Sequence, residues 1–398
     1  MNRMKRLAAL AAAMLLAVSA GAGLAEVSEE KTMVSGKVAS VTWKDENGVP
    51  AAGPEGYAEV RYIYGRGYTK ETYFDAEGKP FETAGGYCGK AVTRDGKDKI
   101  TKIEYFGADG QLTLNSMGYA AVEYAYYSFG EERKVVFYGD NGKPVIVPSL
   151  GYAQVQTDYS GTTLTGRTYM DVKGNAVDIP AGYAIMKVKM KDHKVIRIWY
   201  THADGKPATG PDGWYKCEMV RDTKGRVTTL RYLDIQENLT DAAGFAREEY
   251  TYEKNGYVKV ARYNTQGSVI PWSGKAVSVR RKMKDEKVLE ETFLDEAGQP
   301  TEVPEGYITV SYTYNSAGQL ETIQYRDANG NKQNCRSGYS TIRQTWNRDG
   351  LLQRRTFLDV NGLNVNNLKG VCEEEYIYDE EGRLTGTRQY DAAGNQLK

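Results

Sequence analysis

A single sequence unit returns every 30 to 32 residues through almost the whole chain. In most units its clearest mark is an Asp-x-x-Gly stretch that follows shortly after an aromatic residue. The Gly of this mark is found at Gly48, Gly78, Gly110, Gly142, Gly174, Gly205, Gly267, Gly298, Gly330, Gly362 and Gly394. Between Gly205 and Gly267 the same slot holds Glu237. Self-similarity at this period is typical of an array of stacked units and argues against one globular enzyme fold.

Two columns of aromatic residues accompany the repeat. An aromatic residue stands five positions before the Gly slot at Trp43, Tyr73, Tyr105, Phe137, Tyr169, Tyr200, Tyr232, Phe293, Tyr325 and Phe357. Arg262 and Gln389 are the exceptions in this column. A second column follows a Gly that comes seven to nine residues after the slot, at Tyr57, Tyr87, Tyr119, Tyr152, Tyr183, Trp214, Phe245, Tyr307 and Tyr339.

Residues 306–330 show how one unit reads as backbone. From Ile308 to Tyr314, apolar or aromatic residues alternate with Thr and Ser, which is the period of a half-buried strand. The stretch from Asn315 to Gly318 predicts a tight turn, because Asn bonds its own backbone and Gly accepts a positive φ. A second strand and the turn at Gly330 complete a hairpin. No unit contains the helical period that a crossover helix would need, so each strand should pair antiparallel with the next.

The sequence therefore predicts an all-β protein, a repeat array of β-hairpins that forms a continuous antiparallel meander. A sheet of about 22 strands cannot stay flat, because right-handed twist accumulates from strand to strand. We expect the meander to coil into a β-spiral or solenoid, with the aromatic columns stacked inside.

The first 25 residues have the pattern of a secretory signal peptide. Basic residues at Arg3, Lys5 and Arg6 precede an apolar run over 7–18, and small residues at 23–25 predict cleavage after Ala25. The run is too short to span a bilayer, so we expect a secreted or cell-surface protein without a membrane anchor. Residues 26–35 are expected to form a loose lead-in, and 36–398 an array of about eleven 30–32-residue repeats.

The charge balance speaks against nucleic acid as a partner. The chain has 52 basic and 52 acidic residues, and the two signs are interleaved rather than gathered into a basic stripe. We therefore expect a carbohydrate, such as cell wall, or a surface protein as the partner.

No catalytic group stands out. The two histidines, His193 and His202, both fall in predicted turns, and no nucleophile elbow, zinc-protease motif or phosphate loop is present. Acidic pairs are frequent, but they recur in every unit, whereas a catalytic pair should be singular. We expect a non-enzymatic protein without a cofactor, metal or catalytic residue.

Calcium and a disulfide are left open as alternatives. Asp327 to Asn331 is the best calcium-loop candidate, although such a loop needs more oxygen ligands and the turn alone explains both Asp and Gly. Of the four cysteines, only Cys335 and Cys372 lie in neighbouring units and suit a disulfide. Buried, unpaired thiols are the favoured reading.

The aromatic columns have two interpretations, an internal ladder of stacked rings or outward platforms for sugar rings. Alternation with Thr, Lys and Glu favours the ladder. The rings that follow Gly lie where a strand begins, and we expect them to be the more exposed. Eight of them are candidates for ligand contact: Tyr57, Tyr87, Tyr119, Tyr152, Tyr183, Trp214, Tyr307 and Tyr339.

Residues 376–395 resemble the YD repeat of the RHS family. The resemblance is carried by Tyr378-Asp379, Gly382-Arg383-Leu384, Tyr390-Asp391 and Gly394-Asn395. It implies a secreted or cell-surface β-spiral, in a family whose members form shells around toxins or bind carbohydrate and protein partners. The unit is longer than the usual YD repeat, and its added segment is more weakly similar to WG and cell-wall-binding repeats.

We thus expect a binding or scaffold module of the cell envelope or exterior. A purely structural or adhesive spacer is the alternative, and an enzyme with an unrecognised site is a second one.

The array is interrupted over 234–275. Glu237 replaces the turn Gly, where a left-handed backbone costs a non-Gly residue roughly 1–2 kcal/mol, and Asn238 is expected to take over that conformation by a one-residue shift. This stretch should be the least regular, and it is the best place to look for a partner site.

Overall fold

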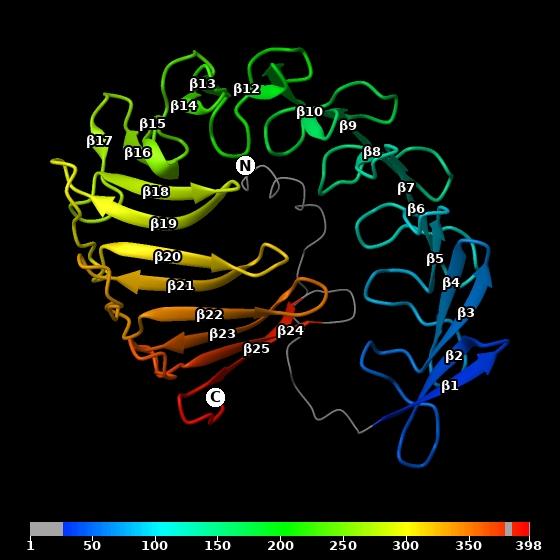
Figure 1. Ribbon diagram of the computed structural model, residues 1–398. Helices are drawn as coiled ribbons and strands as arrows, with labels where there is room; N and C mark the ends of the chain where they lie inside the picture. The colour runs from blue at the N-terminus through cyan, green and yellow to red at the C-terminus, as the bar shows by residue number, and fades with distance from the viewer. Residues whose placement is uncertain (1–26, 379–383, 398) are drawn as a thin grey trace. The chain divides into compact units, whose positions relative to one another are not determined.

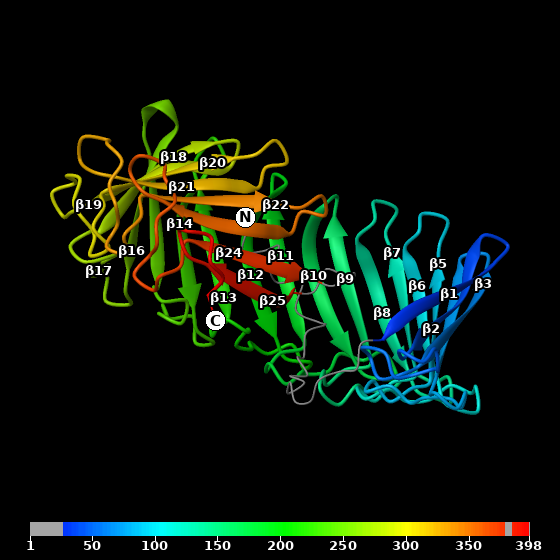
Figure 2. The same cartoon turned by 90° about the horizontal axis from the view of Figure 1, so that it is seen from below.

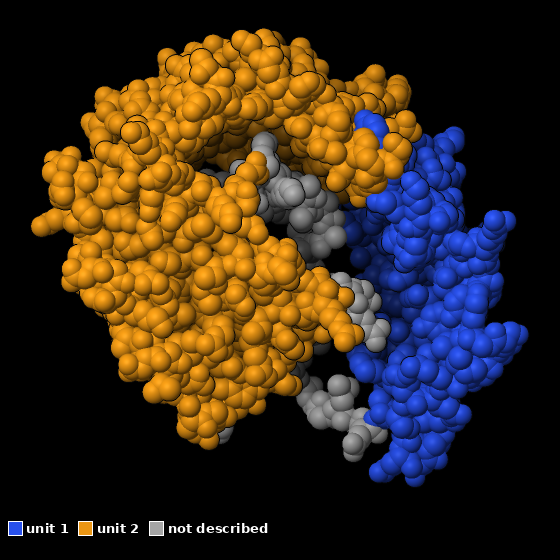
Figure 3. Space-filling view, in the orientation of Figure 1, with its two compact units in different colours: residues 1–127, 135–149 blue, residues 128–134, 150–398 orange. Residues whose placement is uncertain are grey.

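The computed structural model describes residues 27–378 and 384–397. The predicted signal peptide and the first turn of the last hairpin, at Asp379 and Gly382, lie outside the described residues. The described chain divides into two compact units, one of residues up to 127 with 135–149, the other of 128–134 with 150–398 (Figure 3). No described helix is long and apolar enough to cross a membrane.

The described residues confirm the predicted all-β fold, with 25 strands and one 3-10 turn. The first unit contains β1 (Ser28–Val34), β2 (Lys37–Lys44), β3 (Glu59–Gly65), β4 (Tyr68–Phe74), β5 (Gly89–Arg94), β6 (Ile100–Phe106) and β7 (Ala121–Tyr126), and β8 (Glu132–Tyr138) is divided between the units. The second contains β9 (Gln154–Ser160), β10 (Thr163–Met170), β11 (Ile185–Lys191), β12 (Lys194–Thr201), β13 (Lys216–Arg221), β14 (Val227–Leu233), β15 (Arg247–Tyr252), η1 (Lys254–Gly256), β16 (Tyr257–Tyr263), β17 (Val269–Ile270), β18 (Ser278–Lys284), β19 (Lys287–Leu294), β20 (Thr309–Tyr314), β21 (Leu320–Arg326), β22 (Thr341–Trp346), β23 (Leu352–Leu358), β24 (Glu373–Tyr378) and β25 (Leu384–Tyr390).

The strands form an antiparallel meander within each unit. In the first unit β1 to β7 pair in sequence order and lie side by side (Figure 2). In the second unit the strands pair in the same way, and the successive hairpins follow a curved path (Figure 1). This curvature within the unit is what accumulated strand twist produces.

One sequence expectation is wrong at the start of the array. Residues 26–35 were expected to be a loose lead-in, but β1 occupies most of this segment and pairs with β2 over its full length. All seven residues of β1 are exposed, so the strand lacks the alternation of buried and exposed positions that reveals a strand in sequence.

The turns are made by the residues that the repeat pattern singles out. At the end of β20, the Gly318 amide donates to the Asn315 carbonyl over 2.9 Å, and the Gln319 amide donates to Asn315 Oδ1 over 3.0 Å. Gly318 has a φ of +84°, in the left-handed region that glycine tolerates. The turn after β21 repeats this arrangement, with Asp327 Oδ1 accepting from the amides of Asn329 and Asn331.

Pairing is longer within a hairpin than between hairpins. Strands β20 and β21 pair from Thr309 opposite Arg326 to Tyr314 opposite Leu320. The next hairpin joins β21 at three positions only, opposite Thr322, Ile323 and Gln324. The linking segment after each hairpin instead folds back along the strand it has just left, as in the 3.0 Å bond from the Gln333 amide to the Tyr325 carbonyl.

A second contact ties neighbouring hairpins together. The last residue of the first strand donates a side-chain hydrogen bond to a backbone carbonyl of the preceding hairpin. The bonds are Tyr126 to Ile100 (2.7 Å), Tyr252 to Val227 (3.0 Å), Tyr314 to Val288 (2.9 Å), Trp346 to Leu320 (2.8 Å) and Tyr378 to Leu352 (2.9 Å). These aromatic residues therefore connect hairpins where the backbone pairing has already ended.

The core is the predicted internal ladder of rings. In the second unit it runs from Tyr152 to Phe245 and again from Phe293 to Phe357. Ring centroids are 4.8 Å apart between Tyr183 and Tyr200 and 5.2 Å apart between Tyr200 and Trp214. Tyr200 is 2% exposed. Edge-on and tilted ring pairs at these distances stabilise beyond the burial of area alone.

Candidate functional site

The eight rings predicted as candidates for ligand contact lie inside the ladder. Five are buried, namely Tyr57, Tyr119, Tyr152, Tyr183 and Trp214, and three are half-buried, namely Tyr87, Tyr307 and Tyr339. The expectation that they are the more exposed rings is therefore wrong. The linking segment folds back over the sheet and brings these rings against the strand aromatics, as Tyr57 between Trp43 and Tyr73 at 5.1 and 4.8 Å.

The histidines and the turn acids have local structural contacts. His202 accepts the Gly205 amide in its turn, and its Nδ1 lies 2.9 Å from Asp178 Oδ2. His193 is a turn residue with a φ of +58°. Within the described ranges, no group of three or more His, Cys, Asp or Glu side chains is arranged to hold a metal ion. Asp327, from the calcium-loop candidate, accepts amides of its own turn.

All four cysteines are free and buried, which leaves Cys335 and Cys372 unpaired with each other. Cys217 packs in the ladder core beside Tyr200 and Trp214. Burial raises the pKa of the Cys217 thiol to about 12, so this side chain behaves as a small apolar residue.

The turn at Glu237 keeps the regular geometry. Glu237 itself has a φ of +67°, its amide donates to the Asp234 carbonyl over 2.9 Å, and the Asn238 amide donates to Asp234 Oδ1 over 2.8 Å. The expected shift of the turn to Asn238 is therefore wrong. The carboxylate of Glu237 lies 2.6 Å from Lys216 Nζ, and the Lys216 side chain is only 7% exposed. An ion pair thus accompanies the strained backbone.

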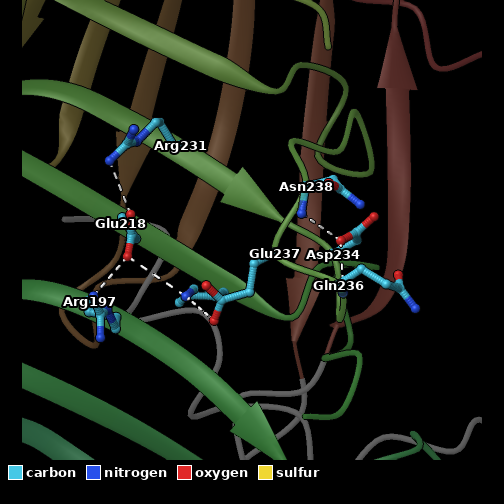
Figure 4. Close-up of polar contacts among 8 residues, drawn as sticks. Arg197, Glu218, Arg231, Asp234, Gln236, Glu237 and Asn238 are labelled. Carbon is cyan, nitrogen blue, oxygen red and sulfur yellow. Dashed lines mark hydrogen bonds and ion pairs between the residues drawn. The ribbon is translucent and has the colours of Figure 1, made fainter.

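A charged cluster surrounds this ion pair (Figure 4). Glu218 lies between two arginines, 2.9 Å from Arg197 and 3.1 Å from Arg231, and 3.9 Å from Lys216. The hydrogen bond and the charge of Lys216 lower the pKa of the Glu237 carboxyl. Lys216 and Glu237 are 21 residues apart. The buried lysine of β13 thus gives a partner to the glutamate that replaces glycine in the turn after β14.

The second interruption is at Arg262, which occupies the ladder position of an aromatic residue. Its guanidinium lies 3.6 Å from the Trp272 ring centroid and 4.7 Å from that of Phe245, and its Nε donates to Glu248 over 3.0 Å. Arg281 also faces Trp272, at 5.1 Å. A planar cation therefore fills the slot between two rings, where cation–π attraction replaces ring–ring contact.

Register explains why a carboxylate is available to Arg262. Glu248 lies directly opposite Arg262, whereas Val310 lies opposite Tyr325 in a regular hairpin. The other exception in the aromatic column, Gln389, also lies opposite a glutamate, Glu374. A polar residue in the aromatic column thus comes with an acid 14 or 15 residues earlier in the sequence. This pairing is a sequence signal that the repeat marks alone did not reveal.

The irregular backbone lies later than Glu237. It begins at η1, where Asn255 has a φ of +60°, and continues to the two-residue strand β17, which shares β16 with β18. The loop after β17 also differs, since its turn is closed by the Ala276 amide donating to the Ser273 carbonyl over 2.9 Å, whereas a Gly amide does so in a regular loop, as from Gly306 to Val303. The buried Trp272 Nε1 has no hydrogen-bond partner among the described residues. The least regular part is therefore 254–276, which coincides with the second half of the predicted interruption to within one residue.

The fold and these clusters define an all-β repeat protein of antiparallel hairpins with an aromatic ladder. No protein-family model matches the chain, and no curated protein matches it significantly. Among solved structures, the chain is similar to TcdB2-TccC3-TEV, at 11% identity and a TM-score of 0.26 over 88% of this chain and 19% of that one. It is also similar to TcdB2-TccC3, at 14% identity and a TM-score of 0.24 over 91% of this chain and 21% of that one. The Photorhabdus luminescens Tc holotoxin pore is similar at 11% identity and a TM-score of 0.21, over 90% of this chain and 25% of that one.

The chain spans about a fifth of the length of the first two of these proteins. TM-scores this low support no functional assignment, and the resemblance of residues 376–395 to YD repeats remains a resemblance.

Proposed function

We propose that the chain is a non-enzymatic repeat scaffold that works at the cell envelope or exterior and binds a carbohydrate or protein partner. The observation that carries this proposal is that the residue types able to do chemistry, such as the turn aspartates, have structural contacts within the repeat. Turn aspartates accept their own backbone amides, and the rings pack on one another. At Lys216–Glu237 and at Glu248–Arg262 a charged residue replaces the usual residue of the repeat, and a specific partner contact fits best there.

The extracytoplasmic location rests on the signal-peptide pattern of residues 1–25. Expression of the full sequence in a bacterial host with intact-mass analysis of the secreted protein tests it. The mass should correspond to a chain that starts at Glu26. Retention of the apolar run over 7–18 in the mature protein would overturn the location.

The binding role is tested by a pull-down of the mature chain, residues 26–398, on purified cell wall. A binding module should sediment with the wall and be released by high salt or by soluble wall fragments. A spacer without a ligand should stay in the supernatant. Turnover of a wall fragment that one carboxylate substitution abolishes would instead support an enzyme and contradict the proposal.

A further inference from the structure

Strand β11 presents three lysines on one face of the sheet. Lys187, Lys189 and Lys191 are exposed, while Met186, Val188 and Met190 between them pack against the ladder core. Side chains two residues apart on a strand point to the same face, roughly 6.6–6.8 Å from one another. The lysines therefore form a row on the face opposite the ladder.

The neighbouring strands extend this row into a patch. Lys187 lies directly opposite the half-buried Trp199 of β12, and Trp199 lies opposite Lys216 of β13. Two cations thus flank one indole ring on the same face. On its other side Lys187 lies opposite Gly166, which has no side chain to cover it.

A second row lies beside the first. Lys189 is opposite Arg197, Arg197 is opposite Glu218, and Glu218 is opposite Arg231. We call the surface formed by Lys187, Lys189, Arg197, Trp199 and Arg231 the β11–β14 face; Lys216 lies beside it but is buried and paired with Glu237.

The lysines of β11 differ from the cations on the same face of other hairpins. Several of those cations are paired with carboxylates, as Arg61 with Glu59 at 2.7 Å, Lys102 with Glu123 at 3.5 Å and Arg354 with Glu375 at 3.3 Å. Within residues 27–378 and 384–397, the side chains of Lys187 and Lys189 take part in no ion pair or hydrogen bond, and their backbones pair with the neighbouring strands. Their charges are therefore available to a ligand.

The nearest acids do not neutralise this face. Glu218 is shared among Arg197, Arg231 and Lys216, and Glu237 is taken by Lys216. Asp158, whose Oδ2 lies over Gly166, contributes one carboxylate at the edge of this face, and it accepts a hydrogen bond from Gln156 rather than from a lysine. The face thus has more cations than carboxylates, while the whole chain is balanced at 52 of each sign.

We propose that the β11–β14 face binds an anionic polysaccharide, an inference that rests on the proposed function and names the ligand class of that function. Carboxylates of successive acidic sugars pair with Lys187 and Lys189, and the apolar face of one sugar ring packs on Trp199. An acidic glycan fits better than nucleic acid, because nucleic-acid binders carry a broad basic excess, whereas this chain as a whole has 52 basic and 52 acidic residues.

Polygalacturonate serves as the probe, with neutral dextran and a single-stranded oligonucleotide as comparisons. Binding to the mature chain is titrated at 50 and 200 mM NaCl. The test variant is Lys187→Gln with Lys189→Gln. The matched control, Lys102→Gln with Lys206→Gln, removes the same charge from lysines that are already paired, with Glu104 and Asp204. Circular dichroism confirms that each variant is folded.

We expect the wild-type chain to bind polygalacturonate and not dextran, more weakly at the higher salt because exposed charges are screened. The test variant should bind at least tenfold more weakly, and the control within twofold of wild type. Trp199→Ala should also weaken binding but leave its salt dependence unchanged. Equal affinity of test variant and wild type would overturn the proposal, and so would tighter binding of the oligonucleotide than of polygalacturonate.

The wall pull-down separates the two proposals. If the wild-type chain sediments with wall and the test variant does so equally well, the β11–β14 face is not the site, and the proposed function stands. If the wild-type chain binds neither wall nor polygalacturonate, both proposals fail.

Discussion

The hairpin of β20 and β21 and the interrupted stretch around β15 and β16 use the same ladder slot with opposite chemistry. In the first, Val310 lies opposite Tyr325, whose ring centroid is 4.5 Å from that of Tyr307. In the second, Glu248 lies opposite Arg262, whose guanidinium is 3.6 Å from the Trp272 ring centroid. Both slots hold a flat group between rings. The comparison shows that the array requires a planar side chain at this position and tolerates a charge when the opposite strand supplies its partner.

The two turns lead to the same conclusion. Gly330 has a φ of +81° and Glu237 a φ of +67°, so the backbone conformation survives the loss of glycine. What differs is the contact with Lys216, whose buried ammonium group gives the Glu237 side chain a partner. The repeat is therefore defined by backbone geometry. Where a side chain departs from the repeat, as at Glu237, a second side chain such as Lys216 supplies its partner.

Removal of a ring from the regular ladder should have the largest effect. Tyr200→Ala deletes a side chain that is 2% exposed and should lower the free energy of unfolding by about 3–5 kcal/mol, measured by urea denaturation. Arg262→Ala should cost less, about 1–3 kcal/mol, because Arg262 is a quarter exposed and the main loss is a partner for Glu248. A larger loss for Arg262→Ala than for Tyr200→Ala would reverse the comparison.

Conversion of the interrupted slot into a regular one should be stabilising. Glu248→Val combined with Arg262→Tyr recreates the Val–Tyr pair of β20 and β21 and should raise the free energy of unfolding by about 1–2 kcal/mol, since a partly buried ion pair is replaced by apolar contact. Each single substitution should be destabilising, because it leaves a charge or a ring beside the wrong partner. A double variant no more stable than the single variants would show that Trp272 requires the arginine.

The irregular backbone should exchange its amide protons faster than the regular hairpin. We expect residues 254–276 to exchange about tenfold faster than 306–330, which corresponds to an opening free energy about 1.4 kcal/mol lower. Native-state hydrogen exchange read by mass spectrometry measures both peptides in one sample. Equal protection would mean that the interruption is not a weak part of the unit.

The ion pair of Glu237 should give a small, pH-dependent contribution. Because the folded-state pKa of Glu237 lies below its ordinary value of 4.5, its stabilising effect is present above that pH and is lost as the pH falls through the lowered value. The wild-type chain should therefore be more stable than Glu237→Gln at pH 7, and the two should converge once the pH has fallen below the lowered pKa of Glu237. In a Lys216→Gln background, Glu237→Gln should have no pH-dependent effect; a persistent difference there would assign the effect to another group.

The turns and the ladder were predictable because their signals are local or strictly periodic. Asn315 and Gly318 make their turn with neighbours in sequence, and the ring column repeats at the period of the unit. The burial of Tyr57 was not predictable, since it depends on a linking segment that folds back onto the sheet. The pairs Lys216–Glu237 and Glu248–Arg262 require the register between strands, which composition and spacing do not fix.

The hydrogen bonds from strand-end aromatics to the preceding hairpin have a mechanical consequence. A force that pulls two hairpins apart in the plane of the sheet, such as those joined by β19 and β20, acts on three backbone pairs and a few side-chain bonds, among them that from Tyr314 to Val288. The longer ladder within each hairpin, as between β20 and β21, is loaded only afterwards. The chain should therefore extend in steps, each releasing one repeat of 30 to 32 residues, and Tyr314→Phe should lower the force of the step at its own junction.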